Sequence, residues 1–202
     1  MSTIRLEPAS IEECNEAFDS LGLTVHGVQL EDNRPLKPVL AATQVGPCLV
    51  TSFSFQQRVH FTGAPRAGFT PFAVMASGDS WYHGEQSLGR DLCGFGTHRR
   101  GSTDAHWVGE MAVVYVPAQL FEHQLEQCHF ERALSRLRAG DNNVGFAPGG
   151  REEFLRMHRL ALAGGLQTGE QLTDMLALML NAPFRSGRPE INEQDRRVVE
   201  AM

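Results

Sequence analysis

Histidine is the residue type in this chain best suited to bind a metal ion or to move a proton near neutral pH. The sequence contains eight: His26, His60, His83, His98, His106, His123, His129 and His158. A metal site inside a β-barrel typically uses a His-x-His pair, because alternate residues of a strand project to the same side. The chain has no such pair, and His123 and His129 fall about 120° out of alignment on a helix. We therefore expect no metal site and no metal cofactor.

Other catalytic motifs are also absent from the sequence. There is no His-Glu-x-x-His motif, no phosphate-binding P-loop and no Gly-x-Ser-x-Gly nucleophile elbow. The Gly94-x-Gly96 pair is followed by Arg99, where a dinucleotide-binding motif needs its third glycine. We expect no catalytic residues and no cofactor, and we therefore expect that the chain is not an enzyme.

The cysteines show no metal-binding or redox spacing. They lie 34, 45 and 35 residues apart, without a Cys-x-x-Cys pair. This spacing argues against a zinc ribbon and against a thioredoxin-type motif. We expect free, buried thiols in a reducing compartment at all four positions, namely Cys14, Cys48, Cys93 and Cys128.

Aromatic residues are the remaining candidates for a binding site. The stretch from Phe69 to Tyr115 contains both tryptophans and both tyrosines, interleaved with glycines. Taken singly, each aromatic residue is expected in the core. Taken together, and interrupted by polar side chains, they also fit an apolar ligand pocket with a few polar anchors. The residues predicted to line this pocket are Phe53, Phe55, His60, Phe72, Trp81, Phe95 and Trp107.

An amphipathic helix is predicted near the start of the chain, over residues 11–21. Ser10 and Glu13 have the spacing of a capping box, and apolar residues then recur at intervals of three and four. Gly22 follows where a helix-ending glycine is expected. One face of this helix should therefore pack against the rest of the protein.

Between residues 23 and 116 the pattern is typical of short strands separated by turns. Runs rich in β-branched and aromatic residues occupy 24–30, 39–43, 48–55, 58–62, 72–76 and 111–116. Turn-forming residues separate these runs, including Ser77-Gly78-Asp79. Alternation sorts the strand at 48–55 into two sides, and we expect the inward side to carry Thr51, Phe53 and Phe55. A small barrel or sandwich is the expected result.

From about Pro117 onward the chain is expected to be helical. Apolar residues recur at helical spacing over 118–138 and 151–163, and again between Thr168 and Pro183. A short glycine-containing turn joins the last two helices and favours an antiparallel helical hairpin. The apolar face of its second helix fits either the core or a dimer seam. The residues predicted to form that seam are Leu172, Met175, Leu176 and Met179.

Composition narrows the classes of function. The chain has 202 residues, 42% of them hydrophobic and 21% charged, with a formal net charge of −6. It has no apolar run near the roughly 20 residues of a membrane span and no signal peptide, so we expect a cytoplasmic protein without membrane contact. An acidic chain without a basic stripe is a poor nucleic-acid binder by itself.

The order of these elements resembles the N-terminal regulatory region of AraC-type transcriptional regulators. The likeness is carried by the run VTSFSFQQRVHFTGAPRAGFTPFAVM, by GDSWYHGEQSLGRDL over 78–92, and by the strand-to-helix step VVYVPAQLF. The closing Arg196-Arg-Val-Val199 is similar to the lead-in to the paired helix-turn-helix domain of this family. The resemblance extends over the whole chain.

The resemblance implies an α+β fold with a cupin-like, jelly-roll type β-barrel after an N-terminal helix, followed by the helical hairpin. It implies an effector-sensing part at 1–118, a helical dimerisation region at 119–183, and a linker with the start of a truncated DNA-binding domain at 184–202. The expected partners are a small-molecule effector, a second copy in a homodimer, and DNA through a C-terminal domain not in this chain. Two alternatives remain: a cupin-type barrel enzyme, either a metal-dependent oxygenase or an isomerase, and a dimerisation module without a ligand.

Overall fold

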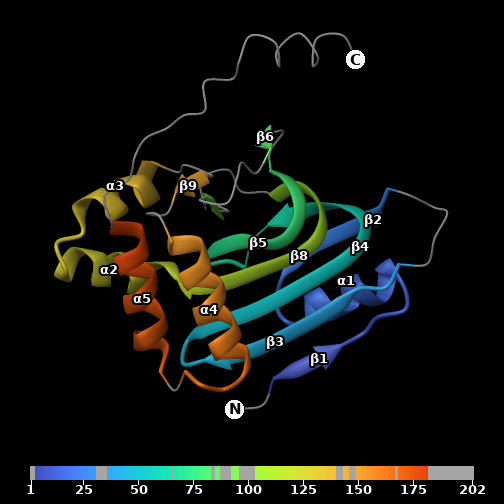
Figure 1. Cartoon of the computed structure of the whole chain (residues 1–202), viewed down its shortest axis with the longest axis horizontal. Helices are drawn as coiled ribbons and strands as arrows, with labels where there is room; N and C mark the ends of the chain where they lie inside the picture. The colour runs from blue at the N-terminus through green and yellow to red at the C-terminus, as the bar shows by residue number, and fades with distance from the viewer. Residues whose placement is uncertain are drawn as a thin grey trace, which may run out of the picture.

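Three long antiparallel strands form the centre of the molecule. In the computed structural model, β8 (Thr103–Pro117) lies between β4 (Cys48–Ala64) and β5 (Phe69–Tyr82), and all three bend strongly along their length (Figure 1). The structure describes residues 3–30, 36–64, 66–82, 85–86, 92–95, 103–139, 143–145, 149–166 and 168–181. The predicted linker and truncated domain at 184–202 lie outside these residues.

Shorter strands extend this centre on both sides. The order is β1 (Ile4–Leu6), β3 (Val39–Val45), β4, β8, β5, β7 (Leu92–Phe95) and β9 (Asn143–Gly145), and each described pair is antiparallel. In addition, β2 (Thr24–Gln29) pairs with the second half of β4, and β6 (Glu85–Gln86) pairs with β5. The α+β class is thus confirmed: an antiparallel sheet with an N-terminal helix and C-terminal helices.

Two predicted interruptions turn out to lie inside continuous strands. The sequence predicted a turn at Ser77-Gly78-Asp79, whereas β5 runs through these residues with a shift of register between Met75 and Ser77. Gly78 and Gly109 are partners across this irregularity and have φ angles of 81° and 108°. A Cβ atom on Gly78 would lie 2.0 Å from the carbonyl oxygen of Val108, so the glycines permit a close approach of two strands and do not end one.

The same correction applies to β4, for which the sequence predicted two strands. A bulge between Phe55 and Val59 joins them into one, and the chain there changes partner from β3 to β2. Gln57 lies in the bulge and is buried. A β-bulge bends the strand that carries it, which accounts for the curvature of the sheet at this point.

The sheet is covered on both faces. The inner face is defined here as the side that carries Phe53, Phe55, Phe61, Trp107 and Met111, and the helix α1 (Ile11–Ser20) packs on it. The outer face carries Val50, Val74 and Val114, and C-terminal helices pack on it. Figure 1 shows α1 behind the sheet and α4 in front of it. Each face has its own hydrophobic core, because alternate residues of β4 and β8 point to opposite sides.

The N-terminal helix has the predicted ends. The hydroxyl of Ser10 accepts a hydrogen bond from the backbone of Glu13 (3.3 Å), and the Glu13 carboxylate accepts one from the backbone of Ala9 (2.8 Å). Gly22 has a φ of 72° and follows the last turn as expected. Asn15 bonds both the N–H and the carbonyl of Gly27 in β2 (2.7 and 3.2 Å), which ties the helix to the strand.

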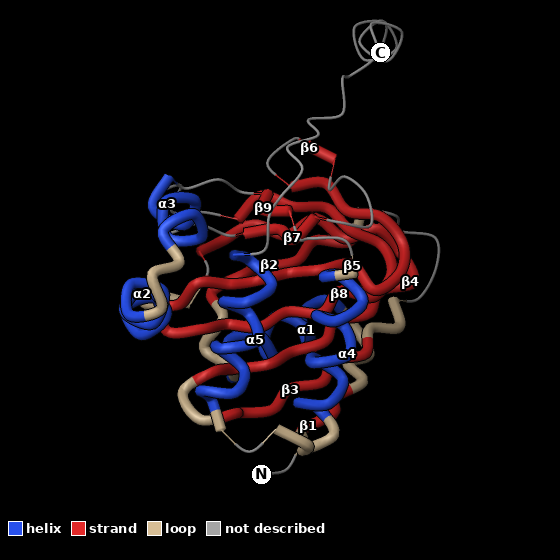
Figure 2. Tube along the Cα trace, turned by 60° about the vertical axis from the view of Figure 1, so that its left-hand side comes forward, coloured by secondary structure: helices blue, strands red, loops and turns tan. Residues whose placement is uncertain are grey.

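In the described part of the chain, four helices follow the last long strand. They are α2 (Ala118–Gln127), α3 (Glu131–Ala139), α4 (Gly150–Leu162) and α5 (Gly169–Asn181). The run predicted to be helical over 118–138 is divided in two at His129, whose φ is 55°. Figure 2 shows α4 and α5 together on one side of the sheet, as the predicted hairpin requires. In the part of the chain that the structure describes, no helix is both long and apolar enough to span a membrane.

Candidate functional site

The inner face carries a cluster of five aromatic rings, contributed by α1, β4 and β8. Phe61 stacks on Trp107 with ring centroids 3.8 Å apart, and Phe55 meets both rings at 5.3 and 5.8 Å. Phe18 of α1 contacts Phe53 edge-on at 5.2 Å and Phe61 at 5.8 Å. The helix therefore closes one side of this aromatic cluster.

Among the residues that the structure describes, two polar atoms inside this apolar face have no hydrogen-bond partner. They are the indole nitrogen Nε1 of Trp107, whose side chain is buried with only 6% of the residue exposed, and the hydroxyl of the fully buried Thr51. A buried donor without a partner costs roughly 1–3 kcal/mol, and native proteins contain few of them. Trp107 therefore stands out on the inner face as a group that can still make a bond.

The neighbours of Trp107 toward β5 whose side chains are described are small. Ser80 is its direct partner on β5 and is buried, and the next inner pair along the strands is Gly109 opposite Gly78. Ala105 precedes Trp107 on the same side of β8 and is buried as well. Among the described side chains, the indole thus has large rings on its β4 side, and Ala105, Gly109, Gly78 and Ser80 along β8 and β5.

The structure brings three of the seven predicted pocket residues together: Phe53, Phe55 and Trp107 lie in the inner aromatic cluster. Phe61 and Phe18 belong to the same cluster and were not among the predicted residues. Alternation in 58–62 could have indicated Phe61, whereas Phe18 is brought there only by the packing of a helix.

The other four predicted pocket residues do not join the cluster. Phe72 is buried in the outer core, where its ring meets Phe121 of α2 at 5.3 Å. His60 is half-buried, and its ring stacks at 4.4 Å on the ring of its cross-strand partner His106. The side chains of Trp81 and Phe95 lie outside the described residues; their backbones pair with His106 and Phe72.

The helix α4 is joined to the sheet by two polar links. Arg151, in its first turn, donates to the carbonyls of Met75 and Ala76 at 2.8 and 3.2 Å, where the register of β5 shifts. His158, two turns later, donates from Nε2 to the carbonyl of Thr51 in β4 at 2.8 Å. A carbonyl oxygen can only accept, so the ring carries its proton on Nε2. One helix is therefore bonded to two strands.

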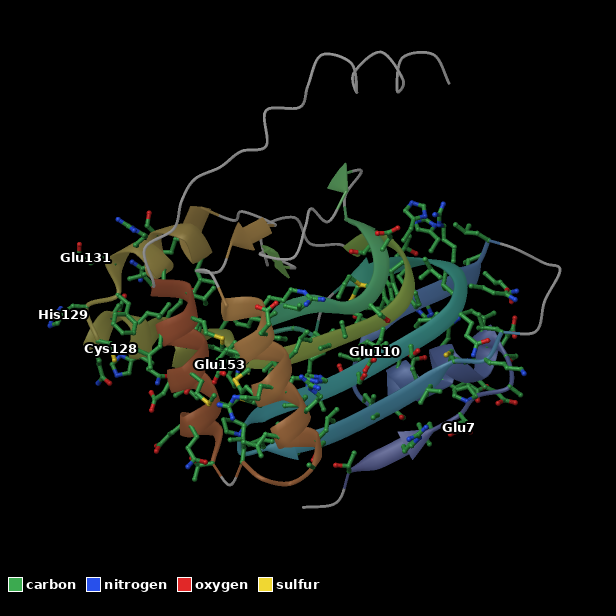
Figure 3. All side chains as sticks on the ribbon, viewed as in Figure 1. Glu7, Glu110, Cys128, His129, Glu131 and Glu153 are labelled. Atoms are coloured by element: carbon green, nitrogen blue, oxygen red, sulfur yellow. The ribbon has the colours of Figure 1, made fainter. Side chains whose placement is uncertain are left out.

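His158 is held in its neutral form by its surroundings. Only 2% of the residue is exposed, and this burial is the main cause that lowers its pKa. The bond to Thr51 and the charge of Glu110 act in the opposite direction, while Arg159 lowers the pKa further. Figure 3 shows Glu110 on the sheet beside α4; its carboxylate accepts from the hydroxyl of Ser52 at 3.2 Å.

The residues predicted to form a dimer seam lie mostly in the chain's own core. Leu172, Leu176 and Met179 are buried among the helices and the outer face, and Met175 is half-buried. On the same helix, Leu178 is 63% exposed.

The cysteines depart from the prediction at one position. Cys14 and Cys48 are buried, and burial raises the pKa of each thiol to about 12. Cys128, in contrast, is exposed, because it caps the end of α2 where the chain turns toward α3 (Figure 3). The side chain of Cys93 lies outside the described residues. Among the side chains that the structure does describe, no three His, Cys, Asp or Glu are grouped so as to hold a metal ion.

The fold is similar to that of a solved regulator. The crystal structure of the AraC-like transcriptional activator CuxR matches with a TM-score of 0.61, covering 99% of this chain and 78% of that one, at 10% sequence identity. No protein-family model and no curated protein matches the sequence. At this identity the likeness shows the fold, and it extends over both the sheet and the C-terminal helices.

Proposed function

We propose that this chain is the regulatory domain of an AraC-type transcriptional regulator. The observation that carries the proposal is the structural match to the AraC-like activator CuxR along 99% of the chain. The sequence resemblance to the same family rests on the order of the elements and on three segments of the sequence, and it supports the same function. Fold alone is compatible with several functions, so the proposal also depends on the chemical properties of the inner face.

In this proposal a small effector binds on the inner face, within a cupin-like barrel formed by 1–118. The aromatic rings there offer apolar surface, and Trp107 offers an unused hydrogen-bond donor. A pocket of this kind, mainly apolar with a few polar groups that fix orientation, is typical of small-molecule sites.

In this proposal α4 transmits the effect of ligand binding from the strands of the barrel to the other C-terminal helices. Arg151 and His158 attach this helix to β5 and β4, so a change in the curvature of either strand changes the position of α4. The helices at 119–183 would then alter the pairing of two copies, and with it the spacing of DNA-binding domains that follow 184–202. An effector produces such a shift only if it binds one of the two states more tightly than the other.

A domain fusion tests this function. Residues 1–202 are placed ahead of the DNA-binding domain of a characterised AraC-type regulator in place of its own regulatory domain, and reporter transcription is measured across a library of small molecules. We expect output that depends on the fused chain and changes with particular compounds. Output equal to that of the DNA-binding domain alone, and unchanged by every compound, would refute the proposal. An Arg151→Met fusion should keep DNA binding and lose most of the response.

A further inference from the structure

We propose that the inner face binds a flat, uncharged molecule that accepts a hydrogen bond from Trp107. This inference rests on the proposed function and specifies the chemistry of its effector. It depends on three properties of the site: the unpaired donor, the absence of buried charge among the described residues, and the arrangement of the aromatic rings.

The unpaired indole N–H of Trp107 indicates that the ligand carries a hydrogen-bond acceptor. The indole Nε1–H can donate but cannot accept. It is buried on a strand in the centre of the sheet and has no partner within the described part of the chain. An acceptor brought to this atom removes the cost of an unsatisfied buried donor, whereas an apolar ligand leaves that cost in place. The site should therefore distinguish two molecules of the same shape by one oxygen.

The lack of buried charge among the described residues of this face favours a neutral ligand. The buried polar side chains that belong to the inner face are Thr51, Gln57 and Ser80, and no Asp, Glu, Lys or Arg is buried in the described part of the chain. An ion taken into this face would lose its hydration without gaining a counter-charge, which is expensive. Amide and hydroxyl groups can bond to a ketone, amide or phenol, but they do not neutralise a carboxylate.

The rings of the inner aromatic cluster favour a flat ligand. Phe55 meets the indole of Trp107 at a steep angle of 69° while Phe61 is nearly parallel to it at 14°, so the rings of the cluster contact one another both edge-on and face to face. Aromatic pairs in such geometries gain roughly 0.5–1.5 kcal/mol beyond the burial of their area. The small residues Ser80 and Gly78 lie on the β5 side of the indole. A planar molecule on that side contacts aromatic carbon and places its acceptor at Nε1.

Three probes of similar size test the acceptor and the charge. Acetophenone is neutral, flat and has an acceptor oxygen; isopropylbenzene replaces that oxygen by a methyl group; benzoate is charged. Their binding to the full chain is followed by NMR of the two indole N–H resonances, with Trp81→Phe used to assign the resonance of Trp107. We expect acetophenone to move that resonance downfield and to bind about tenfold more tightly than isopropylbenzene, as one hydrogen bond of about 1.4 kcal/mol implies. Benzoate should bind most weakly.

The variant Trp107→Phe keeps an aromatic ring and removes the donor. It should lower the affinity for acetophenone about tenfold and leave that for isopropylbenzene within about twofold. Isopropylbenzene binding thus serves as the matched control for folding of the variant. Equal affinities for the two neutral probes, an unmoved Trp107 resonance, tighter binding of benzoate, or no binding of any probe would each overturn the inference. A fusion reporter that responds to a charged compound would overturn it too, while leaving the regulatory function in place.

Discussion

The hydrogen bond between His158 and the carbonyl of Thr51 should contribute to the stability of the folded chain, and substitutions at His158 test this contribution. His158→Phe keeps a planar ring, which can still stack near Phe154, whose centroid lies 6.4 Å from that of the histidine. The variant removes the donor that faces the Thr51 carbonyl at 2.8 Å. His158→Gln is the matched variant, because its amide can donate to the same carbonyl but does not titrate.

The magnitude follows from burial. A typical hydrogen bond contributes about 1 kcal/mol, and leaving a buried group without its partner costs roughly 1–3 kcal/mol. In a chain of this size 1 kcal/mol corresponds to about 2–4 °C in Tm. We therefore expect His158→Phe to lower Tm by roughly 3–9 °C at pH 8, and His158→Gln to lower it by less.

The pH dependence has a definite sign. Burial lowers the pKa of His158 in the folded chain, while in the unfolded chain it stays near the ordinary value of about 6.5. Between these two values the unfolded chain binds more protons, so the free energy of unfolding decreases as the pH is lowered through about 6.5. The stabilising contribution of a neutral His158 is thus fully present above this pH and is lost below it.

Thermal or urea unfolding of the wild type and both variants between pH 8 and pH 5 measures how the free energy of unfolding changes with pH. Each variant should show a weaker loss of stability on acidification than the wild type, because neither carries a titrating group at 158. A wild type and His158→Phe whose unfolding free energies stay parallel over the whole range would refute the reasoning, since the remaining histidines would then account for the pH dependence.

Three further predictions concern other parts of the chain. His129→Gly should stabilise the protein by about 0.5–1 kcal/mol in thermal melts, because glycine has no penalty at the left-handed position that ends α2; a lower Tm would contradict this. Gly27→Ala should destabilise the protein by roughly 1–3 kcal/mol, since its Cβ would lie 2.8 Å from both the ring of Phe61 and the side chain of Ile11 in α1; unchanged urea unfolding would contradict this. In a Cys93→Ser background Cys128 should react rapidly with a thiol reagent, and the buried thiols of α1 and β4 only on unfolding; three equally fast thiols would contradict the burial.

Local signals in the sequence were sufficient for several elements. The capping pair Ser10 and Glu13 and the glycine at position 22 determine where α1 begins and ends, because caps act through residues next to one another in the chain. Alternation in 48–55 likewise determined that Phe53 and Phe55 share a face, since side chains of a strand alternate whatever packs on them. The order of helix, strands and helices followed from the same periodicities.

The tertiary structure decided what lies beyond these local rules. Ser77-Gly78-Asp79 has turn chemistry, yet pairing with β8 keeps the chain extended there. Phe72 was expected in the pocket, but the helices that cover the outer face place it in the other core. His158 donates to a carbonyl 107 residues earlier in the chain, and Trp107 is buried without a hydrogen-bond partner among the described residues. Contacts between residues so distant depend on how the sheet bends and on what packs on each face, and no short stretch of sequence contains that information.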